Sequence, residues 1–343
     1  MNEALTILAA GDEFVRTDLL AGALRDKLGD APTIRELELP WPTTPWSSVA
    51  EVDEAAGDED TMIAALDGIQ VAVTHLAPFT ERVLAHAQDL KLVVVSRGGP
   101  VNVNLDAATK HGIAVCYAPG RNAAAAAEFA VGLMLAACRS IAAGHHELAT
   151  RTWPGHYFRY ESAGIELGDS TVGLVGYGAI GRRVTTVLQA FGAHVLVYDP
   201  MIDEAEDGVE VVRLDELLAR SRVVSLHARL TMDNRGMIGA RELALMPVGS
   251  VLVNSARGGL LDHDALCDAL ESGQLSAAAL DTYPAEPLPP DSRLFDAPRL
   301  VMTPHIAGCS REVAENAARI CADEVGRWVA GQPLAALANP DVL

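Results

Sequence analysis

The chain has few cysteines and few basic residues for its 343 residues. Its five cysteines are odd in number and widely scattered, and no CxxC pair or Cys/His cluster has the spacing of a metal site. We therefore expect reduced, mostly buried thiols and no metal. The 26 basic residues are outnumbered by 46 acidic ones, and the resulting net charge of −20 argues against nucleic acid and anionic membranes as partners.

Two features of exported or membrane proteins are also missing. The N-terminal segment MNEALTILAAGDEF has no basic region before its short apolar run, so we expect no signal peptide. The nearly apolar stretch 123–144 contains Glu128 and Arg139 and is otherwise rich in alanine, which is barely hydrophobic enough for membrane insertion. These absences predict a cytoplasmic protein without a membrane span, in which this stretch is a long buried or interface helix.

What the chain does contain is an alternation of short apolar runs with helical patterns. Half of its residues are apolar, and its length suits about two domains. Such alternation predicts two doubly wound α/β units with parallel sheets and helical crossovers, the second sheet having six strands. An amphipathic helix over about 311–329 is placed to cross back to the first unit. The expected strands lie at 5–9, 33–39, 69–74, 92–95, 113–116, 171–175, 194–198, 223–226, 250–253, 277–280 and 300–302.

The stretch 171–200 has the order strand, glycine turn, helix that a dinucleotide-binding motif requires. In this turn Gly176 suits the sharp bend, Gly178 lets the backbone approach a pyrophosphate, and Gly181 lets the helix pack close to the strand. The unpaired backbone N–H groups at the start of the helix favour the anion. The expected cofactor-binding turn comprises Gly176, Tyr177, Gly178, Ala179, Ile180 and Gly181.

An acidic residue follows the next apolar run. Asp199 lies eighteen residues beyond Gly181, where a carboxylate can accept both ribose hydroxyls and repels a 2′-phosphate. The motif therefore predicts NAD rather than NADP as the cofactor.

A second glycine turn, SRGGPVNVN, follows the fourth run of the first unit. Open α/β sheets bind ligands at the carboxyl ends of their strands. Arg97, beside the backbone N–H groups of Gly98 and Gly99, suits a substrate carboxylate or phosphate. The alternative is an ordinary turn that carries a surface arginine.

Three polar residues, Arg257, Glu286 and His305, follow separate strands of the second predicted sheet. Hydride transfer to a 2-keto acid needs a cation for the carboxylate, a proton donor for the carbonyl oxygen, and a group that keeps the donor charged. Arginine is always charged, histidine titrates near neutrality, and a neighbouring carboxylate favours the charged imidazole. Each residue alone could be structural, but all three behind a nicotinamide motif predict an acid–base site.

These motifs resemble those of the D-isomer-specific 2-hydroxyacid dehydrogenases, including their phosphoglycerate dehydrogenase-like members. The resemblance covers essentially the whole chain. It implies a Rossmann NAD domain over 121–308 inserted into a flavodoxin-like substrate domain formed by 1–120 and 309–343. It further implies an active site in the cleft between the domains and a homodimer formed through the NAD domain. The matching motifs are NAAAAAE at 122–128, GYGAIG at 176–181 with Asp199, SLHARLT at 225–231, NSARGGLLD at 254–262, DTYPAEP at 281–287 and TPHIAG at 303–308.

The resemblance also assigns roles within these motifs. Arg257 would bind the substrate carboxylate and carbonyl, His305 would be the acid–base group, and Glu286 would be its partner. The reaction implied is the NAD-dependent interconversion of a 2-keto acid and its D-2-hydroxy acid. Further residues implied to bind the cofactor are His227, Ala256, Asp281 and Gly308, and those implied to bind the substrate are Arg97, Gly98, Gly99, Arg257 and His305.

The chain departs from the family pattern at two places that bear on the substrate. The loop SRGGPVNVN is shorter than usual, and Arg229 replaces a proline, where it could meet a second anionic group or form a surface salt bridge.

Two alternatives to a hydroxyacid dehydrogenase stay open, an NAD(H)-sensing corepressor-like protein and a formate dehydrogenase. Formate dehydrogenases use an amide where Glu286 stands, which counts against them. The identity of the 2-hydroxy acid is left open.

Overall fold

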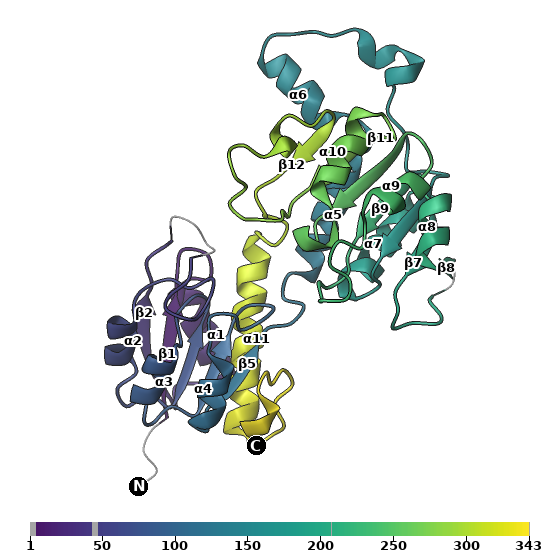
Figure 1. Cartoon of the computed structure of the whole chain (residues 1–343). Coiled ribbons are helices and arrows are strands. Elements are labelled where there is room, and N and C mark those ends of the chain that lie inside the picture. The colour runs from purple at the N-terminus through teal and green to yellow at the C-terminus, as the bar shows by residue number, and fades with distance from the viewer. Residues whose placement is uncertain (1–4, 43–46, 207, 343) are drawn as a thin grey trace. The chain divides into compact units, whose positions relative to one another are not determined.

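The computed structural model describes residues 5–42, 47–206 and 208–342. The chain divides into two compact units, shown in Figure 1. Unit 1 comprises Met1–Asn122 and Ser310–Leu343, and unit 2 comprises Ala123–Cys309. Each unit contains one parallel sheet, as the alternation of apolar runs and helical patterns predicted.

Unit 1 is built on a five-stranded sheet in the order β2-β1-β3-β4-β5. This is the flavodoxin-like order, in which the direction of winding reverses between β1 and β3. All neighbouring strands are parallel, and each overlaps a predicted run. The strands are β1 (Thr6–Gly11), β2 (Thr33–Glu38), β3 (Val71–Thr74), β4 (Leu92–Val95) and β5 (Ala114–Tyr117).

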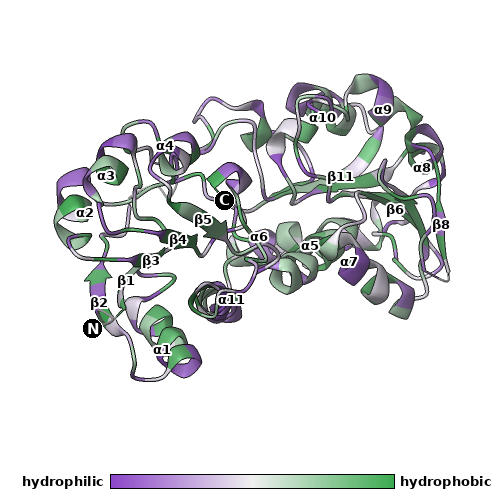
Figure 2. Cartoon of the chain, turned by 90° about the horizontal axis from the view of Figure 1, so that it is seen from below, coloured by the Kyte–Doolittle hydropathy of each residue, from purple (hydrophilic) through white to green (hydrophobic). Residues whose placement is uncertain are grey.

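Helices cover both faces of the unit 1 sheet. Because side chains alternate along a strand, Ile7 and Ala9 of β1 pack with one helix layer, whereas Leu8 and Ala10 pack with the other. Figure 2 shows apolar strands between helices whose outer surfaces are largely hydrophilic. The first layer is formed by α1 (Thr17–Leu28) and α11 (Arg311–Val329), and the second by α2 (Glu59–Ala65), α3 (Glu81–His86) and α4 (Leu105–Lys110).

The sheet of unit 2 has seven strands, not the six predicted, in the order β12-β11-β10-β9-β6-β7-β8. The additional strand, β8 (Val209–Val211), pairs only with β7 at the edge, and it is short with a glutamate at its centre. The winding reverses between β6 and β9. The other strands are β6 (Thr171–Val175), β7 (His194–Tyr198), β9 (Val223–Leu226), β10 (Ser250–Asn254), β11 (Leu275–Leu280) and β12 (Leu300–Met302).

Two helix layers also enclose the unit 2 sheet. Val172 and Leu174 of β6 face the first layer, and Val175 faces the second. The first layer contains α5 (Ala123–Cys138) and α7 (Ala179–Ala190), and the second contains α8 (Leu214–Arg220), α9 (Ala240–Leu245) and α10 (His263–Glu271).

The single long helix predicted over 123–144 is in fact two helices, α5 and α6 (Ile141–Ala149), which meet at 67°. The chain breaks at Ser140, whose φ of 53° lies in the left-handed region. No single helix in the described part of the chain is long and apolar enough to cross a membrane. Only α5 and α6 counted as one segment reach that length and composition, and this segment is bent. α5 packs into the core of unit 2, whereas α6 buries no residue and extends away from the sheet (Figure 1).

The cysteines of the described residues form no disulfide bond. Cys116, Cys138, Cys267 and Cys321 are buried, and Cys309 is exposed. Burial raises the pKa of the Cys116 and Cys138 thiols to about 12, so both are neutral at physiological pH. No group of histidine, cysteine and acidic side chains within the described residues could hold a metal ion.

Candidate active site

The glycine turn joins β6 to α7 in the manner that a dinucleotide requires. Gly176 has a φ of 101°, and a Cβ there would lie 2.6 Å from the backbone nitrogen of Ala228. A Cβ on Gly181 would lie 2.5 Å from the carbonyl oxygen of Gly176, so packing excludes a side chain at both positions. A Cβ on Gly178 would meet nothing within 4 Å. The backbone at the start of α7 is therefore open on this side, which fits the approach of a pyrophosphate.

Asp199 directly follows β7 and is fixed beside this turn. Its Oδ2 accepts a hydrogen bond from the backbone N–H of Tyr177 at 2.8 Å, and its Oδ1 accepts one from Met201 at 2.9 Å. Each carboxylate oxygen keeps acceptor capacity for a ribose hydroxyl. The buried Tyr177 side chain donates to Glu206, which also forms an ion pair with Arg182.

His227 follows β9, at the point where the winding of the unit 2 sheet reverses. Its backbone N–H donates to the carbonyl of Val175 at 2.7 Å, which places it against the end of β6. Burial lowers the pKa of His227 to about 4, so its imidazole is neutral. Its Nε2 is buried and has no hydrogen-bond partner among the described residues. A polar atom of this kind beside the glycine turn fits contact with a bound group.

Arg257 lies in the loop after β10, and its guanidinium is exposed. The Asn254 side chain shapes the loop, since its Oδ1 accepts from the N–H of Ala256 and its Nδ2 donates to the carbonyl of Arg257, both at 3.0 Å. A Cβ on Gly258 would lie only 2.0 Å from the carbonyl oxygen of Tyr283. The loop of Arg257 therefore packs backbone against backbone on the segment that carries Glu286.

Glu286 and His305 are brought into direct contact. Glu286 Oε2 lies 2.6 Å from His305 Nδ1, and Oε1 accepts from the N–H of Tyr283 at 2.9 Å. Burial raises the pKa of Glu286, but the bonds from His305 and Tyr283 and the positive charges of His305 and Arg257 outweigh it, so the net pKa is lowered. The carboxylate is therefore ionised at neutral pH and positioned to stabilise a charged imidazole.

The segment that carries His305 is held by Asp281, a fully buried residue directly after β11. Its Oδ1 accepts from the Thr303 hydroxyl at 2.6 Å and from the N–H of Ile306 at 2.9 Å, and its Oδ2 accepts from the N–H of Ala307 at 2.8 Å. These bonds bracket His305, whose φ is 54°. The sequence assigned Asp281 to the cofactor and missed this positioning role, because its partners lie 22 to 26 residues further along the chain.

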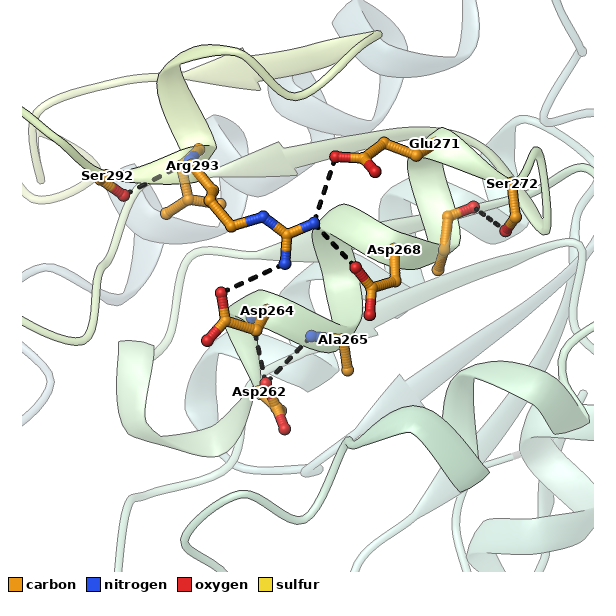
Figure 3. Close-up of polar contacts among 10 residues, drawn as sticks. Asp262, Asp264, Ala265, Asp268, Glu271, Ser272, Ser292 and Arg293 are labelled. Atoms are coloured by element: carbon orange, nitrogen blue, oxygen red, sulfur yellow. Dashed lines mark hydrogen bonds and ion pairs between the residues drawn. The ribbon is translucent and has the colours of Figure 1, made fainter.

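The connection from β11 to β12, which contains Glu286, is also tethered to α10. Figure 3 shows the Arg293 guanidinium reaching along the helix to three carboxylates, those of Asp264, Asp268 and Glu271. The shortest contact is 2.7 Å, to Asp268. Arg293 is about half exposed, so each pair contributes little alone, but together they attach this connection to a rigid helix.

The predicted substrate-binding turn, Arg97 to Gly99, follows β4 in unit 1. The Arg97 guanidinium forms an ion pair with Glu54, a partner that the sequence did not indicate. A Cβ on Gly98 or Gly99 would meet nothing within 4 Å. In unit 2 the side chain of Arg229 is exposed, and the surface salt bridge considered for it does not form with any described residue.

The family of the chain follows from its match to a family model. The model described as the NAD binding domain of the D-isomer specific 2-hydroxyacid dehydrogenases matches residues 131–307, just over half of the chain. The chain belongs to this dehydrogenase family. The resemblance inferred from the motifs is thus confirmed, and with it NAD as the cofactor. The family acts on small hydroxy and keto acids.

Relatives of the chain include the D-3-phosphoglycerate dehydrogenase of Mycobacterium bovis, which is 39% identical over 279 residues. That match covers 80% of the chain but 52% of the relative, so the chain spans about half the length of the curated phosphoglycerate dehydrogenases it matches. Among solved structures, the NAD-dependent formate dehydrogenase of Staphylococcus aureus in complex with NAD is similar, with a TM-score of 0.77 and 26% identity. This match covers 98% of both chains.

Proposed function

We propose that this dehydrogenase interconverts a 2-keto acid and its D-2-hydroxy acid, with His305 as the acid–base group and NAD(H) as the hydride carrier. The observation that supports this most directly is the contact of His305 Nδ1 with the ionised Glu286 carboxylate. The positive charge of Arg257 acts on the same carboxylate. A cation, a proton donor and a carboxylate partner are the groups that the reaction requires.

In the direction of reduction, NADH would supply, when bound, the hydride that the carbonyl carbon of the substrate accepts. Protonated His305 gives the proton on Nε2 to the carbonyl oxygen, so its N–H bond breaks as the hydroxyl O–H bond forms. Glu286 accepts a hydrogen bond from the Nδ1–H group, which orients the ring and stabilises its charged form before the transfer. The planar guanidinium of Arg257 suits the substrate carboxylate. In the reverse direction, neutral His305 accepts the hydroxyl proton.

The contact between the Glu286 carboxylate and His305 favours this reaction over the two alternatives, formate oxidation and NAD(H) sensing. Oxidation of formate releases no proton to a histidine base, so a carboxylate partner for His305 serves no purpose there. A protein that only senses NAD(H) has no need for a histidine–carboxylate pair at all.

We further propose that unit 1, including Arg97, Gly98 and Gly99, binds the substrate and that two copies form a homodimer.

The test is NADH oxidation against a panel of 2-keto acids, with the wild type compared with His305→Ala. Loss of a general acid lowers turnover by about 10²- to 10⁴-fold, while NADH binding, measured by its fluorescence, is retained. The exposed His194, changed to alanine, is the matched control and keeps wild-type turnover. Equal turnover in His305→Ala would remove this residue from the mechanism. If none of the 2-keto acids supports NADH oxidation by the wild type, the proposed reaction is wrong.

A further inference from the structure

The side chain of Tyr177, the second residue of the glycine turn, contacts two charged residues of unit 2. Its hydroxyl donates to Glu206, and the guanidinium carbon of Arg182 lies over its ring, 4.5 Å from the centroid. Glu206 also forms an ion pair with Arg182. Because Arg182 lies near the start of α7 and Glu206 lies between β7 and β8, the three side chains fasten this loop to the helix.

The same loop begins with Asp199, the carboxylate expected to bind the ribose. The backbone N–H of Tyr177 donates to Asp199 Oδ2 at 2.8 Å, so Tyr177 contacts Asp199 through its backbone and Arg182 through its ring. In dinucleotide-binding domains an acidic residue at this position binds the ribose 2′-hydroxyl, whereas an arginine nearby accommodates the 2′-phosphate of NADP. This protein has both an acidic residue and an arginine beside the glycine turn.

Both members of the ion pair are charged at neutral pH. The hydrogen bond from Tyr177 and the guanidinium of Arg182 lower the pKa of Glu206, so its carboxylate is ionised. Burial and the bond to Glu206 raise the pKa of Tyr177, so its phenol keeps its proton and acts as the donor. An arginine side chain is always charged. The charges of Arg182 and Glu206 therefore cancel.

Without Glu206, the guanidinium of Arg182 would favour a 2′-phosphate. Its planar fork of N–H groups matches a phosphate, and this attraction would offset the repulsion by Asp199. Glu206 cancels the charge and also accepts a hydrogen bond from the fork. The side chains of Arg182 and Glu206 are 46% and 55% exposed, so their ion pair adds little stability and its loss should leave the fold intact.

We propose that Glu206 is a specificity-determining residue, which keeps Arg182 from binding the 2′-phosphate of NADPH. Asp199 repels this phosphate directly, and Glu206 neutralises the cation that would otherwise attract it. Two carboxylates of the loop after β7 then maintain the preference for NAD.

The experiment measures the dissociation constants of NADH and NADPH from the fluorescence of the bound nicotinamide, at low ionic strength and without a keto acid. The two cofactors differ only in the 2′-phosphate, so the ratio of their constants reports how the protein treats this group. Glu206→Gln keeps an acceptor for the Tyr177 hydroxyl and removes the charge. It should tighten NADPH binding by about threefold or more, while NADH binding stays within about twofold of the wild type.

Three further variants isolate the role of the ion pair. Arg182→Gln leaves the Glu206 carboxylate unbalanced and should weaken NADPH binding relative to NADH by about threefold. The double variant Arg182→Gln/Glu206→Gln lacks both charges, so the ratio should return to its wild-type value. Glu204→Gln removes an exposed carboxylate from the same loop and should leave the ratio unchanged. Thermal unfolding checks that each variant is folded, and the opposite shifts of the two single variants let either one decide alone.

Several results would overturn this role of Glu206. An unchanged ratio in Glu206→Gln, or a gain that persists in the double variant, would show that Glu206 does not act through Arg182. An equal gain in Glu204→Gln would assign the effect to the total charge of the loop. A wild type that binds both cofactors equally would leave no preference for Glu206 to maintain. None of these results affects the proposed reaction, which is tested with 2-keto acids and His305→Ala.

Discussion

Glu286 Oε2 and His305 Nδ1 lie 2.6 Å apart although the two residues follow different strands and are 19 positions apart in the sequence. Separate supports hold each partner. The N–H of Tyr283 binds the other oxygen of Glu286, and the buried Asp281 carboxylate holds the residues on both sides of His305. The geometry of this pair is therefore set by the ends of β11 and β12 rather than by the pair itself.

The substitution Glu286→Gln keeps the shape of this contact and removes its charge. The lowered pKa of Glu286 keeps its carboxylate ionised across the neutral range, where it favours the protonated imidazole that reduction requires. We expect kcat for keto-acid reduction to fall by about 10- to 100-fold. Its decline at alkaline pH should move to lower pH, because the charge that favours the protonated form is lost. Oxidation of the hydroxy acid, which needs neutral imidazole, should suffer less at low pH.

Profiles of kcat against pH, measured in both directions, check this prediction. Glu216→Gln removes the same charge from an exposed position on α8 and should leave both profiles unchanged. Superimposable profiles for the wild type and Glu286→Gln would show that the carboxylate does not act through His305.

Most of the fold could be predicted because most of its strands, such as β3, β4 and β9, are buried on both faces. β9 and β12 have the bounds that their apolar runs indicated, Val223–Leu226 and Leu300–Met302. β8 was missed because an edge strand of three residues, VEV, has too short an apolar pattern. The break between α5 and α6 was missed because Arg139 and Ser140, neither glycine nor proline, separate two apolar segments. Such a break depends on tertiary packing, which the local sequence does not report.

The candidate site was predictable where its residues form a glycine turn or directly follow a predicted strand. The glycine turn, Asp199 and the three polar residues of unit 2 lie at the strand ends where the sequence placed them. The partner of Arg97 was not predictable, because Glu54 lies in an irregular segment far upstream. The pair of Arg182 and Glu206 joins residues 24 positions apart, and Glu206 belongs to no motif, so only the fold reveals it.

Asp199→Ala should change the preference between NADH and NADPH. The carboxylate beside the glycine turn accepts from Tyr177 and Met201 and repels a 2′-phosphate, so its loss weakens NADH binding and removes the barrier to NADPH. We expect the ratio of kcat/KM for NADPH to that for NADH to rise by about tenfold or more, equivalent to about 1.4 kcal/mol. Asp203→Ala removes an exposed carboxylate nearby and should leave the ratio unchanged. A wild type that uses both cofactors equally would contradict the role of Asp199.

Gly258→Ala should damage the site through packing alone. The added Cβ would lie 2.0 Å from the carbonyl oxygen of Tyr283, and this backbone cannot move without displacing either Arg257 or the segment of Glu286. We expect a loss of stability of about 3 kcal/mol or more, together with reduced turnover. Thermal unfolding and kcat measure the two effects. Gly22→Ala, in the helix α1 where a Cβ meets nothing within 4 Å, should be neutral or slightly stabilising. Equal behaviour of both variants would contradict the packing argument.

The segment after α5 should mediate the proposed homodimer. α6 and the connector beyond it extend away from the unit 2 sheet (Figure 1). Trp153, Phe158 and Tyr160 in this connector are 87%, 95% and 93% exposed. Apolar side chains gathered on one projecting segment are typical of an interface, and a second copy of this chain would cover them.

Changing Trp153, Phe158 and Tyr160 together to serine tests this interface. We expect the wild type to sediment as a dimer and the triple variant as a monomer, because the aromatic area that the partner would bury is lost. Phe295→Ser, at an exposed aromatic residue elsewhere in unit 2, is the control and should remain dimeric. Circular dichroism checks that each variant is folded. A monomeric wild type would rule out the dimer, whereas a triple variant that remains dimeric would place the interface on another surface.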